Sequence, residues 1–172
     1  MEQAKVIETP DDELLRLDSQ LCFALYASSR AIIRTYRERL EPIGITYPQY
    51  LVLITLWEQN GQTISEIGER LMLDSGTLTP LLKRLEVMGH VRRQRSSADE
   101  RQVLIHLTES GRQLREKAAG ARRHVVCRLD MAESEIADLR ANLMDVVARL
   151  ERTGTGAAGA GPGRAPADRS DD

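Results

Sequence analysis

The sequence predicts a mainly α-helical protein: a winged helix-turn-helix with long N- and C-terminal dimerisation helices and a two-stranded wing. Aromatic residues are only 3% of the 172 residues, so the core must be mainly aliphatic, which suits helices. Apolar residues recur at three- and four-residue steps near both ends of the chain, and two short central segments alternate as strands do. The net charge of -2 excludes a global basic field, so any nucleic-acid site must be local.

The first predicted helix follows a polar, flexible N-terminus at residues 1–12. Its apolar stripe consists of Leu14, Leu17, Leu21, Leu25, Ile32, Tyr36 and Leu40. The pattern stops near Pro42. Pro48 suits the first position of a second helix, which stops at Asn60-Gly61.

A helix-turn-helix signal follows. Thr63-Ile64-Ser65-Glu66 is a capping box that opens a short helix. The next helix stops at Gly89, and either Asp74 or Thr77 can cap its start. A cap at Asp74 would put Pro80 inside the helix, where a proline loses a backbone hydrogen bond, whereas a cap at Thr77 would put it in the first turn. The sequence leaves both starts open.

The second half of the chain begins with two short strands, at 91–95 and 102–107, joined by a turn. Thr108 then caps a long helix, and a last helix is expected at 133–152. The tail at 153–172 is rich in Gly, Ala and Pro and is expected to be disordered.

These elements predict one domain at 13–152. Its DNA-binding part is about 48–107, and its dimerisation parts are 13–47 and 108–152. The sequence has no run of about 18 apolar residues and no signal segment, so a soluble cytoplasmic protein that does not enter a membrane is expected. No His/Cys cluster has metal-ligand spacing, so neither a metal nor another cofactor is predicted.

The helix before Gly89 is the candidate recognition helix. Its small polar and basic residues could reach base edges and phosphates: Ser75, Thr77, Thr79, Lys83 and Arg84. Arg93 and Arg95 precede the turn of the hairpin and Arg101 follows it, and arginines on such a tip can enter a minor groove. Asp99 could hold the Arg101 guanidinium in a bidentate pair. The alternative is a plain helix with surface polar residues and a solvated charged hairpin.

The stretch ISEIGERLMLDSGTLTPLLKRLEVMGHVRRQRSSADERQVLIHLTESGR resembles the winged-helix core of MarR-family transcription regulators. The matching features are the wing tip Asp99-Glu100-Arg101, the helix stop at Gly89, and Leu107, Thr108 and Gly111 of an LT-x-x-G motif. LCFALY, together with Tyr47-Pro48-Gln49-Tyr50, is similar to the organic hydroperoxide sensing repressors of that family, in their two-cysteine branch. The resemblance covers about residues 17–150. It implies a homodimer, not an enzyme, that binds a pseudo-palindromic operator in double-stranded DNA and represses a peroxide-detoxifying gene.

Cys22 is the candidate redox-sensing residue. With Asp18 as N-cap it lies in the first turn of its helix, where unpaired N–H groups and the helix dipole favour a thiolate. A thiolate attacks the O–O bond of a peroxide and becomes sulfenic acid. A small buried hydrophobe is the alternative from the residues alone, and the resemblance favours the redox role. The apolar neighbours Leu21, Phe23 and Leu25 could favour organic hydroperoxides, or could equally belong to the core.

Tyrosine hydroxyls could donate hydrogen bonds to the sulfur. Tyr26 is one turn from Cys22 on the same helix. The resemblance adds Tyr36 and Tyr47, because tyrosines at the matching positions of the family contact the reactive cysteine across the dimer. Packing at the edge of the core is the alternative for all three.

Cys127 is the second cysteine. Its neighbours Val125, Val126 and Leu129 predict partial burial, which suits an inert core thiol. The resemblance implies instead that Cys127 is the resolving cysteine, which forms a disulfide with Cys22 of the other subunit. Because the two sulfurs are expected to start too far apart to bond, the helices would have to move, which would shift the two recognition helices off their spacing of about 34 Å.

Three other functions are left open by the sequence. One is a MarR-type repressor that senses a small aromatic ligand and has structural cysteines. Another is a thiol peroxidase, although the chain has no C-x-x-C motif. The third is a DNA-binding activator or architectural protein.

Overall fold

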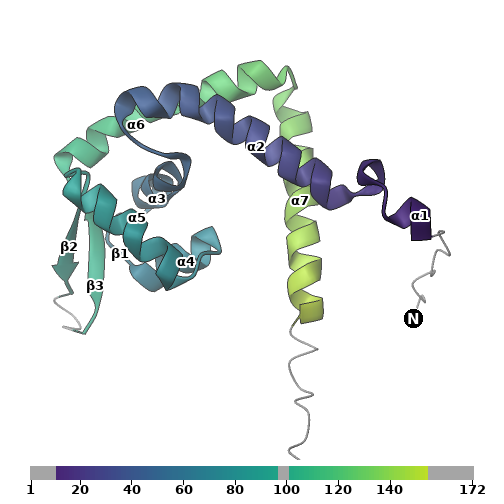
Figure 1. Cartoon of the computed structure of the whole chain (residues 1–172). Coiled ribbons are helices and arrows are strands. Elements are labelled where there is room, and N and C mark those ends of the chain that lie inside the picture. Colours follow the sequence, from purple (N-terminus) through teal and green to yellow (C-terminus); the bar gives the residue numbers. More distant parts are fainter. Residues whose placement is uncertain (1–10, 97–100, 155–172) are drawn as a thin grey trace, which may run out of the picture. The chain divides into compact units, whose positions relative to one another are not determined.

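The computed structural model describes residues 11–96 and 101–154, and confirms the predicted winged-helix architecture (Figure 1). The chain divides into two units, one that ends at Leu129 and one that begins at Asp130.

The N-terminal arm comprises α1 (Asp11–Leu14), a 3-10 turn η1 (Leu17–Ser19) and the first half of α2 (Leu21–Leu40). The expected single helix is therefore interrupted, and the N-cap of α2 is Gln20 rather than Asp18, which lies in η1. The helix is interrupted for a local reason. The Gln20 side-chain amide donates to the carbonyls of Leu14 and Arg16, and these hydrogen bonds end the preceding turn. The helix then restarts at residue 21.

After α2 the chain turns through η2 (Glu41–Ile43) and Gly44, whose φ of 78° suits glycine, into α3 (Tyr47–Glu58). Thr46 caps α3, and its N–H donates to the Gln49 side chain at 2.8 Å. Pro48 is the second residue of this helix rather than the first, and its missing N–H is needed at neither position.

The helix-turn-helix consists of α4 (Ile64–Leu71) and α5 (Ser75–Val87). The capping box is confirmed: the Thr63 hydroxyl accepts from the Glu66 N–H at 3.2 Å, and the Glu66 carboxylate accepts from the Thr63 N–H at 2.7 Å. Asp74 caps α5 by accepting from the Thr77 N–H at 2.8 Å, which decides between the two predicted starts. Pro80 therefore lies inside the helix, on its exposed side, where water can satisfy the carbonyl that a proline leaves unbonded.

The wing is part of a three-stranded antiparallel sheet of order β1-β3-β2. Strands β2 (Val91–Arg95) and β3 (Val103–Leu107) confirm the predicted hairpin, although β3 begins one residue later than expected. Strand β1 (Gln62–Thr63) was not predicted, because it is too short for an alternating pattern. Its place is fixed by the buried Gln62 amide, which donates to the carbonyls of Thr55 at 2.7 Å and Gln59 at 2.6 Å.

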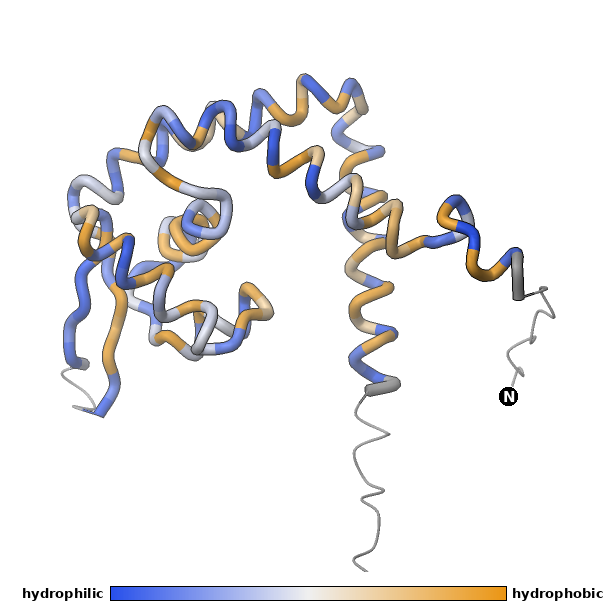
Figure 2. Tube along the Cα trace, viewed as in Figure 1, coloured by the Kyte–Doolittle hydropathy of each residue, from blue (hydrophilic) through white to orange (hydrophobic). Residues whose placement is uncertain are grey.

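The long helix α6 (Glu109–Leu129) packs along α2, and the elements from α3 to β3 lie on one side of this pair (Figure 1). Figure 2 shows apolar residues gathered where α3, α4 and α5 face one another. Among the described residues the fully buried apolar side chains are Leu40, Val52, Leu53, Leu56, Ile67, Leu78, Leu82, Leu85, Ile105, Ala118 and Ala121. These residues form the core predicted to be aliphatic.

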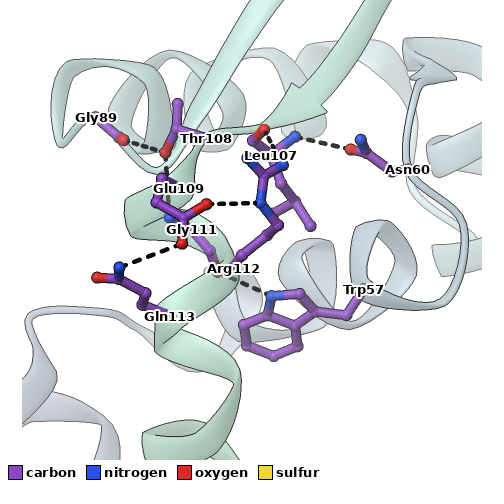
Figure 3. Close-up of polar contacts among 9 residues, drawn as sticks. All are labelled: Trp57, Asn60, Gly89, Leu107, Thr108, Glu109, Gly111, Arg112 and Gln113. Carbon is purple, nitrogen blue, oxygen red and sulfur yellow. Dashed lines mark hydrogen bonds and ion pairs between the residues drawn. The ribbon is translucent and has the colours of Figure 1, made fainter.

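The start of α6 is fastened to the base of the wing at a contact we call the wing–α6 junction (Figure 3). Its polar contacts join Trp57, Asn60, Gly89, Leu107, Thr108, Glu109, Gly111, Arg112 and Gln113. Thr108 caps α6, since its hydroxyl accepts from the Gly111 N–H at 3.1 Å. A Cβ atom at Gly111 would lie 2.0 Å from the carbonyl oxygen of His90, so only glycine allows this close approach of two backbones.

The second unit contributes α7 (Glu133–Gly154), two residues longer than the predicted helix. Its apolar stripe is Ile136, Leu139, Leu143, Val146, Val147 and Leu150. A flexible N-terminus was predicted at 1–12 and a disordered tail at 153–172. Most of both segments lies outside the described residues, but 11–12 belong to α1 and 153–154 to α7. In the ranges 11–96 and 101–154, no helix is both long and apolar enough to cross a membrane.

Candidate functional site

The recognition helix α5 separates a buried stripe from a polar surface. Leu78, Leu82 and Leu85 are fully buried at helical spacing. The predicted DNA-contacting residues all lie outside this stripe and are exposed: Ser75, Thr77, Thr79, Lys83 and Arg84. The Thr77 hydroxyl donates to Asp74 at 2.9 Å, so it can still accept a hydrogen bond from the amino group of a base. This surface has the small and basic groups that DNA recognition needs.

The wing places its predicted arginines differently. Arg93 forms an ion pair with Glu86 of α5, with 3.1 Å between Nε and Oε2, so it holds β2 against the recognition helix. Arg95 is exposed at the end of β2, and Arg101 is exposed just before β3. Asp99 lies outside the described residues, and its pairing with Arg101 stays a prediction. Arg95 and Arg101 are therefore the arginines nearest the wing tip, and Arg93 lies in the middle of β2.

Cys22 is the second residue of α2, so its predicted place in the first turn is confirmed although the cap differs. Its thiol is exposed, and the Gln20 side chain accepts no hydrogen bond from the first turn. The neighbours Leu21 and Phe23 are 62% and 42% exposed, so they are not part of this chain's core. An exposed thiol at the positive end of a helix, flanked by apolar side chains, can meet an apolar reagent.

Tyr36 and Tyr47 pack together, with ring centroids 4.9 Å apart. Tyr50, which was not among the predicted site residues, joins them at 5.5 Å from Tyr36 and 6.2 Å from Tyr47. Three-residue spacing on a helix places Tyr47 and Tyr50 on one face, which was the signal available for this cluster. We call Tyr36, Tyr47 and Tyr50 the tyrosine cluster.

The tyrosine cluster keeps its phenols protonated at neutral pH. Burial, with smaller contributions from the two neighbouring tyrosines, raises the pKa of Tyr36 to about 12. Burial also raises the pKa of Tyr47 and of Tyr50 above the ordinary value. Protonated phenols are hydrogen-bond donors, so the cluster suits an anionic acceptor such as a thiolate.

The thiol and the tyrosine cluster of one chain do not meet. Tyr36 follows Cys22 by 14 residues on the same helix, which is roughly 21 Å at 1.5 Å per residue. Tyr26 lies one turn from Cys22, and its hydroxyl accepts from Arg30 at 3.1 Å, so the phenol proton is left to donate. Contact between Cys22 and Tyr36 or Tyr47 therefore requires a second chain.

Cys127 is exposed, which corrects the predicted partial burial. The buried positions of α6 near it are Ala121 and Val125, and Cys127, two residues after Val125, points to the opposite side of the helix. The bond between His124 Nε2 and Glu38 Oε2, at 2.9 Å, fixes the pairing of α6 with α2. This pairing leaves the two cysteines of one chain roughly 20 Å apart along α2, far beyond the reach of a disulfide.

In the described residues, no group of three or more His, Cys, Asp or Glu side chains could hold a metal ion. His90 and His124 have protein partners, Ser110 Oγ at 3.0 Å from His90 Nδ1 and Glu38 for His124. The cysteines and the tyrosine cluster are therefore the chemically distinctive groups outside the DNA-facing surface.

Comparison with known proteins identifies relatives among transcription regulators. The family described as "Transcriptional regulator SarA/Rot" matches residues 34–118. The HTH-type transcriptional regulator TtmR of Methylorubrum extorquens is 60% identical over 110 residues, which are 64% of this chain but only 56% of that protein. The organic hydroperoxide resistance transcriptional regulator of Bacillus subtilis is 56% identical over 104 residues, 60% of this chain and 71% of that protein.

The solved structures of AbfR from Staphylococcus epidermidis are also similar. Reduced AbfR bound to DNA is 42% identical with a TM-score of 0.67, and the match covers 81% of this chain and 96% of that chain. The disulfide form of AbfR is 43% identical with a TM-score of 0.58, over 79% of this chain and 96% of that chain.

Proposed function

Since the chain belongs to the MarR family of winged-helix transcription regulators, we propose that it is a redox-sensing repressor. The reduced homodimer binds operator DNA in the cytoplasm, and oxidation of Cys22 by an organic hydroperoxide releases it. One observation carries the proposal: the exposed Cys22 thiol stands in the first turn of α2 beside exposed apolar side chains.

The oxidation step needs only the thiol and the peroxide. The Cys22 thiolate attacks one peroxide oxygen, an S–O bond forms and the O–O bond breaks. The leaving alkoxide takes up a proton and departs as an alcohol, and the sulfur becomes sulfenic acid. Exposed Leu21 and Phe23 favour a peroxide with an apolar organic group over hydrogen peroxide.

The homodimer supplies the hydrogen-bond donors. In one chain the tyrosine cluster is roughly 21 Å from Cys22, so Tyr36 and Tyr47 of one subunit serve the thiolate of the other. Their raised pKa keeps them protonated and able to donate. Tyr26 of the same chain adds a nearer hydroxyl.

Cys127 resolves the sulfenic acid. Its thiol attacks the Cys22 sulfur of the other subunit, an S–S bond forms and water leaves. The exposure of both cysteines and their separation within one chain support a bond between subunits. The helices must move to close it, and the two α5 helices then lose the spacing of about 34 Å that two operator half-sites require.

The test uses the fully reduced protein and an operator duplex that this protein has selected from random sequences. DNA binding is measured before and after one equivalent of cumene hydroperoxide, and the same samples are run on a non-reducing gel. Loss of binding with a thiol-reversible dimer band is expected, and Cys22→Ser should abolish both. Cys127→Ser should lose the band and, because it cannot form the disulfide, should stay bound to the operator after oxidation. Unchanged binding of the oxidised wild type would contradict the proposal.

A second candidate function has one supporting observation. A cavity of about 490 Å³ opens beside Tyr47, and Ile33 and Arg37 line its wall. Glu41 lines the same cavity and pairs with Arg37, with 3.2 Å between Nε and Oε2, so the partly apolar wall suits a small aromatic ligand. A Cys22→Ser protein that still left DNA when such a ligand was added would support a ligand-sensing repressor with structural cysteines.

A further inference from the structure

The tyrosine cluster continues into a second set of contacts. The Tyr50 ring is 6.3 Å from the ring of Trp57, edge to face, on the same helix. The Trp57 indole N–H donates to the carbonyl of Gly111 at 2.9 Å (Figure 3). Tyr50 is buried, whereas Trp57 lies at the edge of the core, so α3 carries an aromatic line from the tyrosine cluster to α6.

The line ends at the base of the wing. The Gly111 N–H donates to the Thr108 hydroxyl, and this hydroxyl donates to the carbonyl of Gly89 at 2.6 Å. Gly89 follows the end of the recognition helix and precedes β2. Three hydrogen bonds therefore connect the Trp57 indole to the point where the recognition helix, the wing and α6 meet (Figure 3).

We propose that Tyr50 and Trp57 are positioning residues that couple the oxidation of Cys22 to the placement of the wing and the recognition helix. The proposal rests on the proposed redox function. When Cys22 is oxidised, the Tyr36 and Tyr47 hydroxyls lose their thiolate acceptor and the pair repacks. Tyr50 touches both rings, and a close-packed interior passes such a displacement on rather than absorbing it in voids.

The bond between Trp57 and Gly111 gives the coupling a single removable link. Trp57→Phe keeps an aromatic ring on Tyr50 but deletes the N–H donor. We expect this variant to oxidise at Cys22 at the wild-type rate and to bind the operator when reduced within about threefold of wild type. The ratio of its operator affinity when reduced to its operator affinity when oxidised should fall at least tenfold, because the oxidised protein stays bound to the operator.

Two further variants sharpen the test. Tyr50→Leu removes the ring and should lose the affinity ratio in the same way, whereas Tyr50→Phe keeps the ring and should retain it. The matched control is Glu58→Gln, which removes an exposed ion pair with Arg70 next to Trp57 and should leave the ratio unchanged. If Tyr50→Leu does not fold, Trp57→Phe still decides the question.

The chain has a single tryptophan, so its fluorescence reports on this link alone. Oxidation should shift the Trp57 emission in the wild type, and Tyr50→Leu should abolish the shift. Trp57→Phe and Tyr50→Leu proteins that oxidise and leave the operator as the wild type does would overturn the coupling while the redox function stands. A wild type that oxidises without leaving the operator would instead overturn the redox function itself.

Discussion

The body, which runs from α3 to β3, buries its leucine side chains, whereas the N-terminal arm exposes them. In the body Leu53, Leu78 and Leu82 are fully buried. In the arm Leu15 is 83% exposed and Leu21 62%. The body is thus stabilised by contacts within the chain, whereas the arm presents apolar surface and a thiol to something outside it. Stability and the proposed redox chemistry therefore belong to different parts of the chain, and substitutions should separate them.

The largest effect is expected from emptying the body. Leu82→Ala removes a fully buried side chain and should lower the free energy of unfolding by about 3 kcal/mol. Leu21→Ala, the same change in the arm, should lower it by less than about 0.5 kcal/mol at concentrations where the protein is monomeric. Urea denaturation at two protein concentrations checks both, and equal losses in the dilute samples would break the distinction between body and arm.

The next effect concerns self-association. Phe23→Asp puts a charge on the exposed apolar surface of the arm and should raise the dimer dissociation constant at least tenfold. Sedimentation equilibrium measures this constant. Ser28→Asp adds the same charge at another exposed position of α2 and serves as the control. A Phe23→Asp protein that dimerises like the wild type would place the interface elsewhere.

A smaller effect is expected at the capping box. Thr63→Ala deletes the hydroxyl that accepts from the Glu66 N–H and should cost about 1 kcal/mol of stability. Ser65→Ala, at an exposed position of the same helix without this bond, should cost less. Thermal unfolding of the two variants measures this difference in stability. Neither substitution should change the rate of Cys22 oxidation, because the cap belongs to the body.

The smallest effect is the response to acid. Hydrogen bonds from the Thr63 backbone lower the pKa of Glu66, and those from the Thr77 backbone lower the pKa of Asp74. Because these folded-state pKa values lie below the unfolded ones, their stabilisation is complete above the ordinary carboxyl range of about 4. It is lost as the pH falls through the folded values. The midpoint temperature of thermal unfolding should therefore fall as the pH is lowered below about 4. This fall should be shallower for Glu66→Gln than for Glu69→Gln.

Most of the helices, and the strand β3, could be predicted because their sequence signals are local. The capping box at Thr63, the stop at Gly89 and the alternation of β3 each depend on neighbours in sequence. Strand β1 and the cap of α2 could not be predicted, since one depends on the distant partner β3 and the other on Gln20 reaching back to earlier carbonyls. Both are tertiary or medium-range contacts that no periodicity records.

The candidate site divides in the same way. The first-turn position of Cys22 follows from helix signals, whereas the exposure of Cys127 depends on which face of α6 meets the core. Arg93 pairs with Glu86, a contact between two elements that only the folded chain brings together, and its predicted contact with DNA stays a prediction. Tyr50 was visible in the sequence, but its role depends on ring contacts with α2.

Gly111 also limits how this protein can evolve. A methyl group at this position would overlap the His90 carbonyl oxygen, so even alanine requires the wing base and α6 to move apart. A single-residue change cannot make that move without breaking the Thr108 and Trp57 contacts on either side. Sequence drift at position 111 is therefore blocked, and variants that alter the angle of the wing must arise through paired changes at residues around it.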